Sequence, residues 1–168
     1  MSYCVYKHTS PTGKAYIGVA NANPLKRWQN GNGYKNQPLF YLAIKLYGWD
    51  NLTHEILIQD IPSLAEVNKL EKEYIGKYNT FWNGYNMRPQ TGGNFIFKDR
   101  VFWQPSCELF WSILRYHHFK SAGKNPQYPS AEELIKEFNL VSGYEVDAII
   151  EQAYQAMIME RPELIDMR

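Results

Sequence analysis

Residues 3–20 read YCVYKHTSPTGKAYIGVA, and this stretch decides how the chain begins to fold. Tyr3–Thr9 and Ala15–Ala20 are rich in alternating aromatic and β-branched residues, a pattern typical of strands. Between them, Ser10-Pro11-Thr12-Gly13 predicts a turn, because Pro presets φ and Gly accepts a positive φ. The chain is therefore expected to open with a β-hairpin.

Tyr6 and Tyr16 have the same parity in these two expected strands. Side chains alternate between the faces of a sheet, so a short loop places both phenols on one face, opposite or diagonal to each other. Cross-strand aromatic packing is the simpler explanation of the pair, and a shared chemical role is the alternative.

Helical and extended patterns alternate over residues 21–93. Asn23 and Pro24 predict the cap and first position of a short helix, and the Gly- and Asn-rich segment Gln29–Gln37 is expected to be a loop. Further on, the patterns predict a helix over Pro38–Tyr47, a strand over Leu52–Ile61 and a helix from the capping box at Ser63 to about Tyr78. The predicted fold class is α+β, a small three-stranded antiparallel sheet flanked by helices.

The helix after Ser63 carries a charged residue in its apolar stripe. Glu71 falls within the stripe, whereas Lys72 and Glu73 belong to the polar face. A carboxylate on the packed side of a helix costs several kcal/mol unless it is paired or bound to a cation. A buried ion pair, a stripe edge that reaches water, and a metal or catalytic site all remain open at this point.

The charge is unevenly distributed along the chain. Residues 1–94 carry ten Lys and Arg against six Asp and Glu, whereas residues 95–168 carry eight against eleven. A basic first part suits a polyanionic partner such as nucleic acid, although such an excess also occurs in ordinary soluble domains.

Composition argues against a membrane protein and a disulfide scaffold. No stretch of about 18 apolar residues occurs, and the N-terminus lacks the basic and apolar regions of a signal peptide. Cys4 and Cys107 are isolated thiols, which suits a reducing, cytoplasmic environment.

Several short motifs, taken in order, resemble the GIY-YIG nuclease superfamily. Cys4-Val5-Tyr6 and Tyr16-Ile17-Gly18 resemble its paired signature, and Arg27 follows at the expected distance on the first helix. The sequence LEKEYI at residues 70–75 resembles the acidic helix motif, and Gly84-Tyr85-Asn86 resembles the closing motif. The resemblance covers about residues 3–93 and is strongest to phage intron-type homing endonucleases.

The resemblance implies hydrolysis of DNA phosphodiester bonds with one divalent ion per active site, Mg²⁺ or Mn²⁺, held by Glu71. Tyr6 is then the general base or its hydrogen-bonded relay, Tyr16 positions water or phosphate, and Arg27 stabilises the transition-state charge. Asn86 orients the site through hydrogen bonds. Further phosphate contacts are expected from four lysines, each of which is otherwise a solvated charge: Lys14, Lys26, Lys35 and Lys45.

The chain departs from the family pattern in two places. Only the Tyr of Cys4-Val5-Tyr6 matches the family tripeptide, and Lys35 stands where some homing relatives carry His. His8 and His54 match no catalytic position, so both are interpreted as ordinary strand residues.

Residues 95–168 match no motif and are expected to form a helical extension of the nuclease domain at residues 1–94. Helices are predicted over Glu108–Phe119, after Pro129-Ser130, and around Val146–Met157. A DNA-recognition module, a dimerisation module and a helical cover on the nuclease are the alternatives, and the acidic balance disfavours a broad phosphate footprint.

The sequence thus predicts a homing- or restriction-type endonuclease that acts on double-stranded DNA and has no membrane partner. A homodimer is one way in which such an enzyme could cut both strands. The alternative is a non-catalytic DNA-binding or regulatory protein that keeps the scaffold. The presence together of Tyr6, Tyr16, Arg27 and Glu71 favours catalysis.

Overall fold

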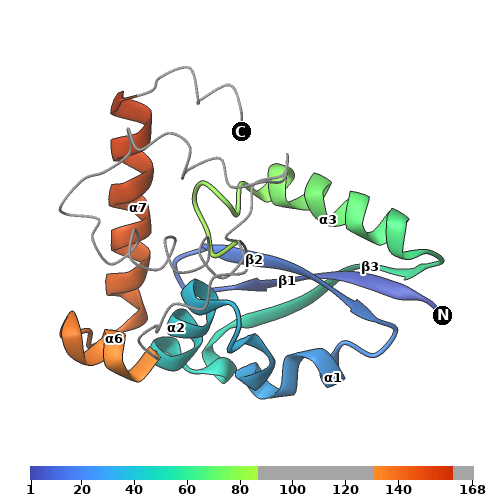
Figure 1. Ribbon diagram of the computed structural model, residues 1–168, viewed down its shortest axis with the longest axis horizontal. Helices are drawn as coiled ribbons and strands as arrows, with labels where there is room; N and C mark the ends of the chain where they lie inside the picture. Colours follow the sequence, from blue (N-terminus) through green and yellow to red (C-terminus); the bar gives the residue numbers. More distant parts are fainter. Residues whose placement is uncertain (87–130, 161–168) are drawn as a thin grey trace, which may run out of the picture.

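The computed structural model describes residues 1–86 and 131–160 (Figure 1). Strands β1 (Tyr3–Thr9) and β2 (Ala15–Asn21) form the expected antiparallel hairpin. In the intervening turn, Gly13 has a φ of 91° and its amide donates to the Ser10 carbonyl at 2.9 Å. Tyr6 lies opposite Gly18, and His8 lies opposite Tyr16. The two phenols are therefore diagonal neighbours on one face, which confirms the prediction from parity.

Strand β3 (Thr53–Ile61) pairs antiparallel with β1, so the three-stranded sheet has the order β2-β1-β3. His8 lies opposite His54 in this second pairing. The central strand β1 therefore brings residues of the hairpin next to residues from the middle of the chain. The predicted α+β class is confirmed.

The first helices lie between β2 and β3 in sequence. Helix α1 (Leu25–Trp28) has Pro24 as its cap residue, so it begins one position later than the prediction of Asn23 as cap and Pro24 as first helical residue. The Asn23 side chain still accepts a hydrogen bond from the Leu25 amide at 3.1 Å. The segment expected to be a loop is instead partly wound as η1 (Gln29–Tyr34), a 3₁₀ segment kinked by positive φ angles at Asn30 and Gly31. Helix α2 (Pro38–Tyr47) has the predicted bounds and is followed by the short η2 (Trp49–Asn51).

Helix α3 (Leu64–Tyr78) starts with the predicted cap, since the Ser63 hydroxyl accepts from the Glu66 amide at 3.1 Å. It runs along one side of the sheet, whereas α1 and α2 lie on the other (Figure 1). On the α3 side, the Lys7 ammonium lies 4.1 Å from the centre of the Tyr78 ring. On the other side, Phe40 of α2 stacks on Tyr16 with ring centres 4.6 Å apart. Tyr16 and its neighbours are thus enclosed in an aromatic core.

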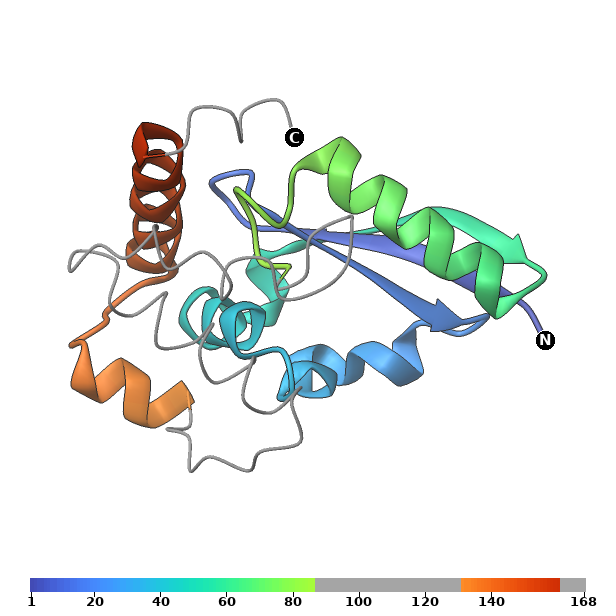
Figure 2. The same ribbon diagram turned by 45° about the horizontal axis from the view of Figure 1, so that its top comes forward.

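Two helices of the second part are described, α6 (Ala131–Glu137) and α7 (Gly143–Glu160). Helix α7 stands beside α2 and the β1–β2 turn (Figure 2). Helix α7 thus packs against the first part of the chain. The helix predicted over Glu108–Phe119 lies outside the described residues. None of the helices in the described part of the chain is long and apolar enough to cross a membrane.

Candidate active site

Three phenols meet on the sheet face that α1 and α2 cover. Tyr6 and Tyr34 are fully buried, and their hydroxyl oxygens are 3.0 Å apart. The Tyr16 ring centre lies 5.4 Å from that of Tyr34. Sequence reasoning missed Tyr34 and selected the next residue, Lys35, which the structure leaves exposed. The only local signal for Tyr34 was a lone aromatic residue in a segment of Gly and Asn.

Arg27 lies against these phenols. Its guanidinium carbon is 4.6 Å from the centre of the Tyr34 ring, and its Nη1 donates to the Gly33 carbonyl. It also hydrogen-bonds the Tyr16 side chain. A guanidinium held in this way offers its remaining donors in a fixed direction, which suits a phosphate.

Burial sets the protonation of the phenols. It raises the pKa of Tyr6 to about 12, against the hydrogen bond from Tyr34 and the positive charge of Arg27, which lower it. Burial also raises the pKa of Tyr16 and of Tyr34 above the ordinary value for a phenol. At neutral pH the three hydroxyl groups therefore stay protonated in the free protein.

Glu71 is carried by α3, which packs against β1 and β2, the strands that hold Tyr6 and Tyr16. Its side chain is half-buried, and its negative charge acts on Tyr6 and Tyr16, raising the pKa of both. Within the apolar stripe of α3, Val67 and Ile75 are buried. Glu71 therefore lies at the packed side of the helix, as its position in the stripe predicted.

The donor set beside Glu71 fits a hard cation that keeps most of its water. Among the described residues, no three His, Cys, Asp or Glu side chains gather as metal ligands. One carboxylate suits Mg²⁺, which dehydrates reluctantly and commonly takes one or two carboxylates from a protein.

Asn86 acts on the site through the backbone of β2. Its side-chain oxygen accepts from the Ile17 amide at 2.8 Å, and its side-chain nitrogen donates to the Ile17 carbonyl at 2.9 Å. The amide side chain thus pairs with β2 as a neighbouring strand would. Ile17 lies between Tyr16 and Gly18, so Asn86 fixes the strand that carries Tyr16.

Gly18 leaves the room that the Tyr6 phenol occupies. A Cβ atom at this position would lie 2.6 Å from the Tyr6 hydroxyl oxygen and 2.7 Å from the ring carbon that bears it. The sheet register therefore requires Gly at the end of the Tyr16-Ile17-Gly18 motif.

Gly18→Ala is expected to destabilise the protein by about 1–3 kcal/mol, because the fully buried Tyr6 ring has no free space to move into. Chemical denaturation monitored by circular dichroism measures this effect. A denaturation midpoint equal to that of the unsubstituted protein would show that the ring moves aside at no cost.

The four lysines expected to contact phosphate differ in their surroundings. Lys26 and Lys35 are exposed. Lys14 pairs with Glu151 at 3.0 Å and its side chain is only 10% exposed, and Lys45 pairs with Glu132 at 3.3 Å.

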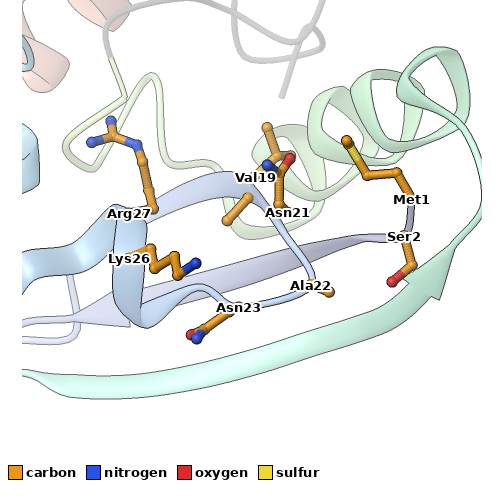
Figure 3. Close-up of a pocket in the computed structure, with 9 residues that line it drawn as sticks. Met1, Ser2, Val19, Asn21, Ala22, Asn23, Lys26 and Arg27 are labelled. Atoms are coloured by element: carbon orange, nitrogen blue, oxygen red, sulfur yellow. The ribbon is translucent and has the colours of Figure 1, made fainter.

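A pocket of about 590 Å³ lies next to Arg27, between the end of β2 and α1. Figure 3 shows Lys26 and Arg27 at this pocket, with Asn21 from the end of β2 and Asn23 from the segment before α1. The pocket therefore combines positive charge with amide side chains that can donate hydrogen bonds to phosphate or sugar oxygens.

A carboxylate, an Arg and buried phenols on a small antiparallel sheet are groups that phosphodiester hydrolysis uses, to bind a metal and stabilise charge. The fold and the site thus define a nuclease-type domain. A sequence profile of the GIY-YIG catalytic domain matches residues 2–86, just over half of the chain, and the chain belongs to this family. Neither the curated proteins nor the solved structures yielded a match. The family is one of DNA nucleases, which generally use divalent metals.

Proposed function

We propose that this protein is a metal-dependent endonuclease that hydrolyses phosphodiester bonds of double-stranded DNA. The observation that carries the proposal is that Arg27 lies against the Tyr34 ring, beside Tyr6 and Tyr16, while α3, which carries Glu71, packs on the β1–β2 hairpin that holds both phenols. Glu71 comes from α3, Arg27 from α1 and both phenols from the hairpin, so the sheet and both its helical layers contribute.

Each of these residues has a separate role in the proposed reaction. Glu71 would hold Mg²⁺ or Mn²⁺, which when bound neutralises charge on the phosphate. Tyr6 orients the attacking water and takes up its proton, and Tyr16 positions the water or a phosphate oxygen. Arg27 stabilises the negative charge that builds on the phosphate in the transition state. Asn86 keeps β2 in register through its two bonds to Ile17.

The DNA backbone would approach along α1. Lys26 and Arg27 are the basic residues of the pocket, and Lys35 is exposed on the next segment. Lys14 and Lys45 remain proposed phosphate contacts, and in this structure both are engaged with glutamates.

We also propose a homing- or restriction-type role in the cytoplasm. One such active site cuts one strand at a time, so cleavage of both strands requires a homodimer or two successive nicks. Linear product formed without a nicked intermediate would support the dimer.

The function is tested by incubating the purified protein with supercoiled plasmid in Mg²⁺, in Mn²⁺ and in EDTA. The proposal predicts nicked or linear plasmid in either metal and intact plasmid in EDTA. A mobility shift without cleavage in any metal would instead establish the rival function, a non-catalytic DNA-binding protein.

A further inference from the structure

A continuous row of hydrogen bonds leads away from the Tyr6 hydroxyl. The Tyr34 hydroxyl lies 3.0 Å from that of Tyr6 and 2.7 Å from Nε2 of His8. On the other side of the His8 ring, Nδ1 lies 2.9 Å from Nδ1 of His54. Nε2 of His54 bonds the Trp49 carbonyl oxygen at 3.1 Å. The row thus connects the proposed base to β3.

The middle of this row is closed to water, whereas its far end is not. His8 is fully buried, and its ring contacts Phe40, Trp28 and Trp49 at centre-to-centre distances of 5.5, 4.8 and 4.9 Å. His54 is partly exposed, and its ring stacks on Trp49 at 4.0 Å. Of the four side chains in the row, His54 is the partly exposed one, so a proton that moves along the row from Tyr6 leaves it at His54.

The hydrogen positions in the row follow from its last member. A carbonyl oxygen only accepts, so Nε2 of His54 carries a hydrogen. When His54 is neutral, its Nδ1 accepts from Nδ1–H of His8, and Nε2 of His8 accepts from the Tyr34 hydroxyl. When His54 is a cation, its Nδ1–H donates to Nδ1 of His8, Nε2–H of His8 donates to Tyr34, and the Tyr34 hydroxyl donates to Tyr6, whereas the bond to the Trp49 carbonyl keeps its direction. In the structure the Tyr34 hydroxyl donates to Tyr6, so outward passage of a proton begins when both hydroxyl hydrogens rotate, after which Tyr6 donates to Tyr34 and Tyr34 donates to Nε2 of His8.

We propose that this row is a proton relay of the nuclease reaction, with His54 as the terminal acceptor and with Tyr34 and His8 as positioning residues that conduct the proton. The inference rests on the proposed function and extends it to residues of β3 and η1.

The relay moves one proton by one place along each bond. As the water oxygen bonds to phosphorus, the water proton passes to Tyr6 and the Tyr6 proton passes to Tyr34. The Tyr34 proton passes to Nε2 of His8, and the Nδ1 proton of His8 passes to His54. The bond between phosphorus and the leaving sugar oxygen breaks, and that oxygen takes a proton from solvent. The His54 cation then releases its extra proton to solvent.

The charged and titratable groups around the row are consistent with His54, at its partly exposed end, as the proton acceptor. Burial, His54 and Arg27 lower the pKa of His8 to about 2. Burial lowers the pKa of His54, whereas its bond to the Trp49 carbonyl and the charge of Asp50 on η2 raise it. Besides His8, Tyr34 and Asp50, the groups that face the two rings from other elements are Arg27 of α1 and Tyr16 of β2.

The relay requires neutral His54, which fixes the sign of its pH dependence. The rate of cleavage is full above the pKa of His54 and falls as the pH falls through that pKa, below the ordinary value of about 6.5. A histidine with a purely structural role imposes no such limb on the rate.

The test uses the full chain with His54→Gln, whose amide keeps hydrogen-bonding groups at the position and cannot accept a proton. We expect the single-turnover rate to fall about 100-fold at saturating DNA, with the affinity for DNA unchanged and the acidic limb lost. In His54→Ala, free imidazole should restore the rate, whereas 1,2,4-triazole, of similar shape and much lower basicity, should not. The matched control is Glu55→Gln on the same strand, half-exposed and paired with Lys7.

The outcomes separate the relay from the nuclease function. If His54→Gln cleaves at the rate of the unsubstituted protein with the same acidic limb, the relay is wrong and the nuclease function stands. If triazole restores His54→Ala as well as imidazole does, the role of His54 is space filling and the relay is also wrong. If the unsubstituted protein cuts DNA in no metal, the proposed function itself fails, and the relay fails with it.

Discussion

Replacement of Glu71 with Gln is expected to reduce the rate of DNA cleavage by about 10³-fold. A bound divalent ion contributes several kcal/mol to stabilising the transition state, and about 4 kcal/mol corresponds to that factor. Gln keeps the size of the side chain and removes the charge that acts on Tyr6 and Tyr16. Because the side chain is only half-buried, the fold should tolerate the change.

The matched control is Glu73→Gln, which makes the same chemical change two residues further along α3. Glu73 is exposed and pairs loosely with Lys69 at 3.9 Å, so neither the rate nor the stability should change measurably. Single-turnover cleavage of a plasmid in Mg²⁺ measures both variants, and circular dichroism checks their fold. Equal rates for Glu71→Gln and the unsubstituted protein would remove Glu71 from the proposed metal site.

The second large effect is expected at Asp147, whose carboxylate joins α7 to the nuclease domain. This side chain is 2% exposed, and its Oδ2 accepts from Ser10 at 3.1 Å and from Tyr47 at 2.6 Å. The Thr12 hydroxyl also donates to Oδ2, and the Tyr85 hydroxyl donates to Oδ1. One carboxylate thus accepts hydrogen bonds from the β1–β2 turn, from α2 and from the segment before Asn86.

Asp147→Ala should lower the free energy of unfolding by about 4 kcal/mol. The substitution leaves the Tyr47 and Tyr85 hydroxyls buried without their acceptor, and a buried unsatisfied group costs about 1–3 kcal/mol. Domains of this kind have total stabilities of about 5–15 kcal/mol, so the loss is a large share. Urea denaturation measures it, and hydrogen exchange at α7 tells whether this helix separates first.

Glu151→Gln is the control for this experiment, because Glu151 lies one turn further along α7 and pairs with Lys14 at 47% side-chain exposure. Glu151 is largely exposed and Lys14 keeps its hydrogen bond to Asn83, so the change should cost at most about 1 kcal/mol. A loss of stability no larger at Asp147 than at Glu151 would show that the carboxylate does not hold the two parts together.

The sequence predicted those parts of the fold that depend on residues close to one another in the sequence. The bounds of β1 and α2 follow from alternation and from helical spacing, and the start of α3 follows from a capping box whose two residues, Ser63 and Glu66, are three positions apart. The loop at Gln29–Gln37 was predicted less well, because its 3₁₀ turns depend on contacts with Arg27 and α2 rather than on its own residues.

In the candidate site too, the residues that the sequence identified are those marked by local patterns. Tyr6, Tyr16 and Arg27 are close in sequence, and the apolar stripe of α3 distinguished Glu71 from its charged neighbours. Their order and spacing carried the family assignment, which the profile match over residues 2–86 confirms. The sequence by itself therefore determined the fold class, the family and the residues most directly proposed for the chemistry.

Only the tertiary structure decided what surrounds those residues. Tyr34 enters the site through the kink of η1, and His8 meets His54 because β1 and β3 pair across 46 positions of sequence. Asp147 bonds Ser10 across 137 positions. Periodicity and capping act over a few residues, whereas these contacts depend on sheet register and on the packing of distant helices. The sequence thus determined the residues proposed for the reaction, and the tertiary structure determined which side chains surround them.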